Sequence, residues 1–256
     1  MKSQASSGEI RIIPIPFSAD IQAGDSIVGE LLRAMQHQKL SLTSGDILIV
    51  KHKIVSKAEG QIVKLETIKA SPASRSWARR YHLDARVTEA AISQSKRIVR
   101  RRRGVLITET QHGFVCANSG VDVSNVDGGR SALLLPLDPD RSASRIHREL
   151  KRRLGIFLPV IITDSFGRAW REGLTEVAIG VAGMKPMHDY RRQRDSHKYV
   201  LQASIEAVAD ELACAAGLVC GKLSRTPACI VRGFPYRTGS GRARDLIRPA
   251  ANDLFR

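Results

Sequence analysis

Two short segments of this chain place oxygen-bearing side chains directly after apolar runs. The first run, at 158–162, is followed by Thr163, Asp164 and Ser165. A run of this kind is typical of a buried strand, and ligands of α/β sheets bind at the edge where such strands end. A carboxylate beside a hydroxyl suits a hard cation such as Mg²⁺ or Mn²⁺. The same residue types also form turns and helix caps, so this segment alone leaves both interpretations open.

The second segment follows an apolar stretch at 113–115 and contains Asn118, Asp122, Ser124 and Asn125. Taken alone, these are ordinary turn residues. However, each of the two loops follows a predicted strand and offers an Asp beside a hydroxyl or an amide. Proteins usually hold magnesium with one or two carboxylates while substrate phosphates supply further oxygens. Together the two loops therefore predict a metal site with two carboxylates.

Cationic side chains follow the same kind of strand end. Three lysines lie within 51–57, directly after an apolar run, and Arg168 and Arg171 follow Asp164. Lysines there can form a solvated edge or can reach a phosphate. Arginines can hold phosphate or carboxylate oxygens. The chain contains neither GxxxxGK[ST] nor GxGxxG, so scattered cations and backbone amides would have to hold any nucleotide.

The composition favours an anionic partner. The 256 residues include 41 Lys and Arg against 25 Asp and Glu, a formal net charge of +16. Nucleic acids, nucleotides and phosphorylated or polycarboxylate substrates all fit this charge. The run at 96–103 contains six basic residues but no aromatic residue and no known nucleic-acid motif. We therefore expect that run to be a solvated face or to guide an anionic substrate, and nucleic acid is the less favoured partner.

The remaining composition indicates a globular protein. The four cysteines and seven histidines lack the spacing of a zinc site, so we expect reduced, buried thiols in a cytoplasmic protein. No apolar run approaches the roughly 20 residues that span a membrane, and the N-terminus does not resemble a signal peptide.

The elements that must position these residues alternate along the chain. Strands are predicted near 10–15, 47–50, 105–107 and 228–231. Helices are predicted after Asp25, from Ser71 to about 97 with a break near His82, after Asp138, and over 204–219. No repeat or linker separates them. We expect a mixed α/β domain with interleaved halves over 10–235, a disordered stretch at 1–9 and a basic tail at 236–256.

Several segments, in consistent order over 10–235, closely resemble the coenzyme F420-0:L-glutamate ligase family. They are 45–47, 57–60, 122–125, 135–143 and 162–168, extended by 177–180, 209–212 and 231–233. The resemblance implies an unusual mixed-sheet α/β fold that works as an intertwined homodimer. It also implies an enzyme that uses GTP to join L-glutamate to coenzyme F420-0, through an acyl phosphate. F420-0 is a deazaflavin with a lactyl-phosphate tail.

The resemblance also implies roles for individual residues. Asp122 and Asp164 correspond to metal-binding carboxylates, and Ser165 stands where a Thr usually supplies a further ligand. Two divalent ions, Mg²⁺ or Mn²⁺, are implied, with K⁺ as an optional addition. Lys57 and Arg168 would offset phosphate charge during catalysis. The implied nucleotide contacts are Ser18, Ala19, Asp20, Ile21, His52, Lys53, Lys57, Asn125, Gly221, Lys222 and Leu223.

Two departures from the family pattern leave open which base the nucleotide carries and how the chain holds it. His52 and Lys53 replace small hydroxyl residues of archaeal members, and 223–225 differs from their glycine-rich loop. These differences concern the nucleotide and not the metal carboxylates. Three other functions stay open beside the F420-0 ligase. They are a family ligase with another anionic acceptor, a metal-dependent phosphohydrolase, and a basic nucleic-acid-binding protein.

Overall fold

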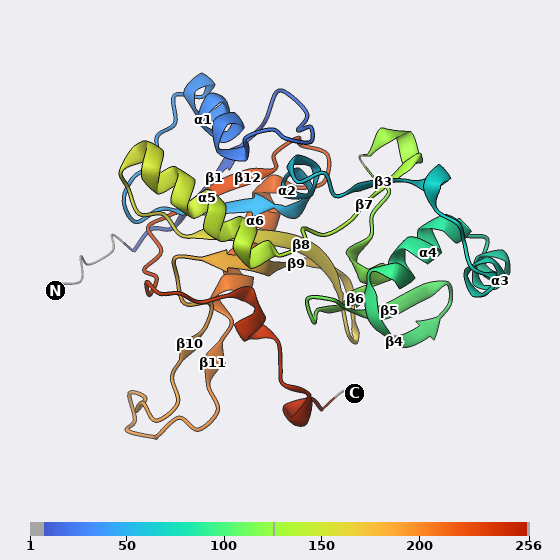
Figure 1. The fold of residues 1–256 in the computed structure, drawn as a ribbon. Coiled ribbons are helices and arrows are strands. Elements are labelled where there is room, and N and C mark those ends of the chain that lie inside the picture. The colour runs from blue at the N-terminus through green and yellow to red at the C-terminus, as the bar shows by residue number, and fades with distance from the viewer. Residues whose placement is uncertain (1–7, 125, 255–256) are drawn as a thin grey trace.

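The centre of the molecule is a five-stranded mixed sheet. The computed structural model describes residues 8–124 and 126–254. The strand order is β1-β12-β2-β8-β9, in which only β2 and β8 run parallel (Figure 1). The strands are β1 Arg11–Ile15, β2 Ile47–Lys51, β8 Val160–Arg168, β9 Arg171–Ala182 and β12 Ala228–Arg232.

Helices cover both faces of this sheet. They are α1 Ile27–His37 and α5 Pro139–Leu154 on one face, and α6 Val208–Cys220 on the other. Because successive strand residues point to opposite faces, Leu48 and Ile162 pack with the first pair of helices, while Ile49 and Ile161 pack with α6. The predicted mixed α/β fold is confirmed. One chain is described, so the intertwined homodimer stays a prediction.

A smaller lobe lies beside the sheet (Figure 1). It contains the sheet β4-β5-β6 together with α3 and α4, and the antiparallel pair β3-β7 connects it to the main body. A hairpin of β10 and β11 projects from the other end of the molecule. The bounds are α2 His52–Ala58, β3 Ile62–Lys64, α3 Pro72–Tyr81, α4 Ala85–Ser93, β4 Ser95–Arg102, β5 Val105–Thr110, β6 Val115–Ala117, β7 Ser131–Leu133, β10 His188–Asp189 and β11 Ile205–Glu206.

Helix ends agree with the sequence in some places and differ in others. Ser71 caps α3, and His82 ends it in the left-handed region at φ 56°, as predicted. Ser26, not Asp25, caps α1, because Asp25 instead accepts the Gln22 N–H at 2.7 Å. The predicted helix end near 97 was wrong, because β4 already begins at 95. The helix predicted from 204 begins at 208, because β11 comes first.

The stretch after 235 packs partly on the domain. Ala243 is fully buried, and its N–H donates to Asp140 Oδ1 at 2.8 Å. Thr238 forms a bridge with Met184. The domain boundaries predicted from the sequence stay predictions, and most of the predicted disorder at 1–9 falls on residues outside the described ones.

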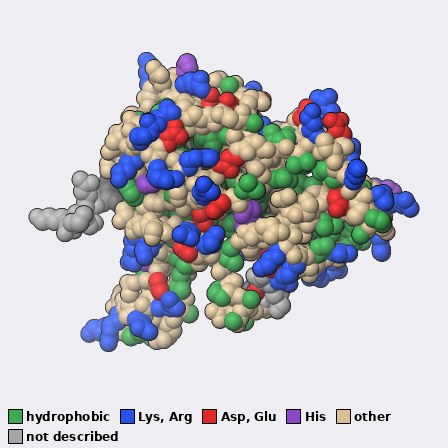
Figure 2. All heavy atoms as spheres, viewed as in Figure 1, with side chains coloured by type: hydrophobic (Ala, Val, Ile, Leu, Met, Phe, Trp, Pro, Cys, Tyr) green, Lys and Arg blue, Asp and Glu red, His purple; other side chains and the backbone are tan. Residues whose placement is uncertain are grey.

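The cysteines and the surface charge complete the description. All four thiols are free; three are buried as predicted, but Cys214 on α6 is exposed. No helix in the described part of the chain has both the length and the apolar character needed to cross a bilayer. Lys and Arg side chains are spread over the whole visible face and do not gather in one patch (Figure 2).

Candidate active site

A large cavity opens where the parallel strands β2 and β8 end. Lys51 pairs with Thr163 in register, so the next residues, His52 and Asp164, emerge side by side at this edge. α2 begins at His52 and turns the chain away. The cavity has a volume of about 880 Å³. Its polar lining includes Asp20, Lys51, His52, Lys53, Lys57, Asp122, Thr163, Asp164, Ser165, Glu176, Lys222 and Arg225.

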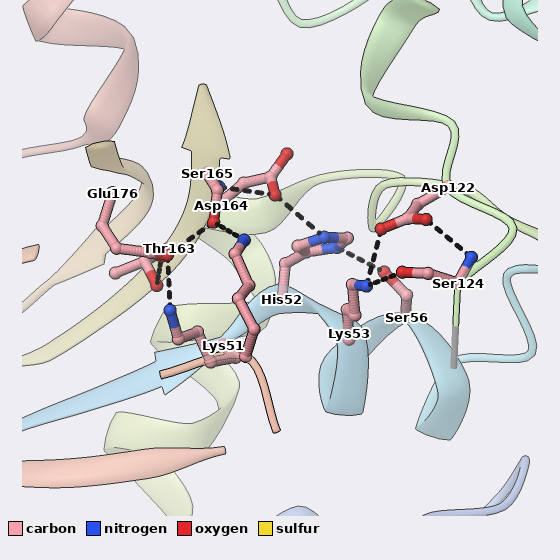
Figure 3. Close-up of polar contacts among 11 residues, drawn as sticks. Lys51, His52, Lys53, Ser56, Asp122, Ser124, Thr163, Asp164, Ser165 and Glu176 are labelled. Atoms are coloured by element: carbon pink, nitrogen blue, oxygen red, sulfur yellow. Dashed lines mark hydrogen bonds and ion pairs between the residues drawn. The ribbon is translucent and has the colours of Figure 1, made fainter. Parts of the chain in front are cut away.

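Asp164 is held as a carboxylate. Its Oδ1 lies 3.2 Å from His52 Nε2 and accepts the Ser165 N–H at 2.7 Å, while His52 Nδ1 contacts Ser56 Oγ at 3.2 Å (Figure 3). Burial acts to raise the pKa of Asp164, but His52 and the Ser165 amide outweigh it and hold that pKa below its usual value. Among the described residues, no donor forms a hydrogen bond with Oδ2. This oxygen can therefore serve a cation.

Asp122 lies across the cavity and pairs with the start of α2 (Figure 3). Lys53 Nζ is 2.6 Å from Asp122 Oδ2 and donates to Ser124 Oγ at 2.8 Å. The Ser124 N–H donates to Asp122 Oδ1 at 2.7 Å. Burial acts to raise the pKa of Asp122, but the Lys53 ammonium and Ser124 lower it by more, so this carboxyl is also ionised.

A third carboxylate was not predicted from the sequence. Glu176 on β9 lies 2.5 Å from Lys51 Nζ and accepts hydrogen bonds from Thr163 Oγ1 at 2.9 Å and from Ser165 Oγ at 2.5 Å. Burial opposes its ionisation, but these partners lower the pKa of Glu176 below its usual value. Lys222 Nζ in turn donates to Ser165 Oγ at 2.5 Å. The available signal was a charged residue directly before the apolar run at 177–179.

The two loops predicted to bind the nucleotide meet at the cavity. The Phe17 N–H donates to the Arg225 carbonyl at 3.0 Å. The Arg225 guanidinium donates to the Ser18 carbonyl at 3.3 Å and lies 3.2 Å from Asp20. Both loops contribute residues to the cavity lining: Phe17, Ala19, Asp20, Ile21, Gly221, Lys222, Leu223, Arg225, Thr226 and Pro227.

Of the remaining predicted site residues, only some line the cavity. Lys57 lines the cavity. Ser18 contacts Arg225 through its carbonyl but does not line the cavity. Arg168 lies exposed at the β8–β9 turn, where it donates to the Glu172 carbonyl at 2.5 Å, so its catalytic role stays a prediction. Asn125 lies outside the described residues.

The donor set suits magnesium or manganese only if the substrate supplies further oxygens. Within residues 8–124 and 126–254, no three His, Cys, Asp or Glu side chains gather closely enough to hold a metal by themselves. Asp122 and Asp164 nevertheless line the same cavity. One or two carboxylates completed by water and phosphate oxygens are how proteins usually hold Mg²⁺. The residues therefore fit the predicted metal, which Asp122 and Asp164 would hold, and the metal itself stays a prediction.

Fold and site together define a class of protein. A mixed sheet whose parallel strands end in a cavity of carboxylates and lysines is typical of α/β enzymes that bind phosphorylated substrates at the sheet edge. The family model described as F420-0:Gamma-glutamyl ligase matches residues 18–233 of this chain. The chain belongs to this family, which confirms the resemblance predicted from the sequence.

Curated relatives match along nearly their whole length. A protein of Methanothermobacter thermautotrophicus named coenzyme F420:L-glutamate ligase is 44% identical over 239 residues, which cover 92% of this chain and 94% of the relative. The protein of that name from Methanopyrus kandleri is 40% identical over 252 residues, covering 96% and 98%. The one from Methanocaldococcus jannaschii is 38% identical over 216 residues, covering 84% and 86%.

Proposed function

We propose that this protein adds L-glutamate to coenzyme F420-0 and uses GTP as the energy source, releasing GDP and phosphate. The family and the names of the relatives support the ligase activity and both substrates. The observation that carries the rest of the proposal is the cavity at the β2–β8 edge, which combines carboxylates with several cations. GTP, F420-0 and glutamate are all anionic, so such a cavity suits each of them.

In this proposal the chain binds the substrates and neutralises the negative charge of their phosphates. Lys53, Lys57 and Lys222 line the cavity and would hold phosphate oxygens. Asp122 and Asp164 would hold Mg²⁺ or Mn²⁺. When bound, these ions would withdraw charge from the phosphates, and K⁺ is an optional further ion. His52 would keep Asp164 oriented, because both of its ring nitrogens already have partners.

The reaction needs no nucleophilic side chain. A carboxylate oxygen of the lactyl group would attack the γ-phosphorus of GTP, and the bond to the β–γ bridging oxygen would break, giving an acyl phosphate and GDP. The glutamate amine would then attack the acyl carbon and lose a proton as inorganic phosphate leaves. Phosphoryl transfer depends mainly on positioning and charge neutralisation, which lysines and carboxylates provide.

A single reconstituted reaction tests this function. Protein, GTP, Mn²⁺, L-glutamate and F420-0 are mixed, and product mass and GDP are followed together. We expect one GDP for each glutamate added, and the masses show whether further γ-linked glutamates follow. GDP formed without a glutamylated product would reject the ligase and favour a phosphohydrolase.

A further inference from the structure

Two ion pairs at the junction of β2 and α2 differ in how firmly they are held. The side chains of Lys51 and Glu176 are 17% and 7% exposed. Those of Lys53 and Asp122 are 26% and 37% exposed. Separating the first pair would leave charges in the protein interior, whereas either member of the second pair can be re-solvated. The Lys53 pair is therefore the one that can exchange partners without opening the core.

The Lys53 ammonium occupies the oxygens that a hard cation would use. It contacts Asp122 Oδ2 at 2.6 Å and Ser124 Oγ at 2.8 Å, while the Ser124 N–H fixes the other carboxylate oxygen (Figure 3). Carboxylate and hydroxyl oxygens are also ligands for Mg²⁺ and Mn²⁺. An ammonium group and a divalent ion repel each other at such short distances, so they cannot share these oxygens.

We propose that Lys53 competes with the divalent cation for Asp122, and that its ammonium moves to a nucleotide phosphate when the cation binds. This inference rests on the proposed function, which places a cation at Asp122. Lys53 lines the same cavity as Lys57 and Lys222, so the released ammonium still faces the substrate.

The exchange couples the binding of cation and nucleotide. A phosphate that attracts Lys53 leaves Asp122 open to the cation, and a cation at Asp122 leaves Lys53 free for the phosphate. By thermodynamic linkage, each ligand must tighten the binding of the other by the same factor. Asp164 differs, because its Oδ2 accepts no hydrogen bond and contacts no lysine ammonium in the described part of the chain. Only one of the two carboxylates is thus subject to this competition.

The decisive measurement is Mn²⁺ binding to the nucleotide-free protein, with free Mn²⁺ determined by electron paramagnetic resonance. Lys53→Met removes the ammonium and keeps an aliphatic stem, and we expect it to bind Mn²⁺ at least tenfold more tightly. Lys57→Met is the matched control. Lys57 lies one turn further along α2, lines the same cavity and pairs with no carboxylate among residues 8–124 and 126–254. It should change the Mn²⁺ affinity less than threefold.

An unchanged or weaker Mn²⁺ affinity in Lys53→Met would overturn the proposal. Equal tightening in both variants would also overturn it, because that result would reflect only the removal of one positive charge. If Lys53→Met does not fold, Lys53→Gln preserves hydrogen bonding and tests the same exchange. In the folded variant, the factor by which GDP tightens Mn²⁺ binding should fall at least fivefold.

One further variant separates this inference from the proposed function. Asp122→Asn should weaken Mn²⁺ binding if a cation binds at that carboxylate. If it does not, the metal part of the proposed function fails, and the competition fails with it. If Asp122→Asn weakens Mn²⁺ binding but Lys53→Met does not tighten it, the metal site stands and only the competition is rejected.

Discussion

Lys51, His52 and Lys53 are consecutive in the chain, yet each faces a different carboxylate. The chain changes from strand to helix between the first and second of them, so the three side chains leave the backbone in different directions. Their partners come from β8, β9 and the loop after β6. This single junction thereby fixes three elements around one cavity. A substitution here is expected to alter binding and positioning together.

At the residue scale, the first prediction concerns Asp164. Asp164→Asn retains the shape and the contact with the Ser165 N–H but removes the negative charge, so we expect at least a hundredfold loss of ligase turnover. The far-ultraviolet circular dichroism spectrum and the melting temperature should change little. Turnover is measured as GDP released. Asp189→Asn, on the exposed strand β10, is the control, and substantial activity in Asp164→Asn would reject its metal role.

The second prediction concerns Glu176 and its ion pair with Lys51. Glu176→Gln should lose about 3 kcal/mol of unfolding free energy, because it leaves the Lys51 ammonium largely buried without its counter-charge. Adding Lys51→Met removes that stranded charge, and we expect the double variant to be more stable than Glu176→Gln alone. Urea unfolding midpoints measure both. Losses that simply add would contradict a coupled ion pair.

The sequence points to the two cavity carboxylates Asp122 and Asp164 more directly than to the residues that hold them in place. Asp122 and Asp164 follow apolar runs, which is a local signal that needs no knowledge of the fold. Glu176 also adjoins an apolar run, but that pattern does not reveal its role, which comes from pairing opposite Ser165 across β8 and β9. Strand register depends on contacts between distant segments, which one sequence does not display. For the same reason, the sequence did not show whether Lys51 faces solvent, a phosphate or, as the structure has it, Glu176.

At the element scale, α5 approaches β9 unusually closely. A Cβ built on Gly180 would lie 2.4 Å from the carbonyl oxygen and 2.6 Å from the carbonyl carbon of Pro139, the first residue of α5. Both atoms belong to the backbone and cannot move aside as a flexible side chain can. The absence of a side chain at Gly180 therefore sets how near the helix lies to the sheet.

The third prediction follows from that approach. Gly180→Ala should destabilise the protein by about 3 kcal/mol, since either the helix or the strand must shift. Gly167→Ala, on the neighbouring strand β8, is the matched control, because a Cβ there would meet no atom within 4 Å. We expect the control to stay within about 0.5 kcal/mol of the parent protein. Equal unfolding midpoints for the two variants would contradict the close packing.

Element ends show where local patterns suffice and where they fail. Asp138 and Gly155 mark the ends of α5 through its caps, which are local signals. The end of α4 was misjudged because register shifts in β4, between Ser95 and Arg97 and between Ile98 and Arg100, conceal the alternation typical of a strand. The start of α6 was misjudged because Ile205 pairs with Asp189, which lies sixteen positions earlier.

At the scale of the whole molecule, the positive charge is not confined to the site. The formal net charge is +16, and basic side chains are distributed over the body, the lobe and the projecting hairpin (Figure 2). Many separated charges of one sign create a long-range field that attracts anions and that salt screens. Arg100 to Arg103 belong to this distant part, because they are exposed on the lobe and do not line the cavity.

The last prediction tests whether this field guides the substrates. With the metal ion saturating, raising the ionic strength from about 50 to 500 mM should lower kcat/KM for GTP about tenfold and change kcat less than twofold, because screening slows encounter and leaves the bound geometry intact. Replacing residues 100–103 by Gln lowers the formal net charge from +16 to +12 without touching the cavity. That variant should have a two- to threefold lower kcat/KM at low salt and an unchanged value at high salt. If variant and parent have the same kcat/KM at low salt, only the cations inside the cavity attract the nucleotide, and the charge on the lobe serves another purpose.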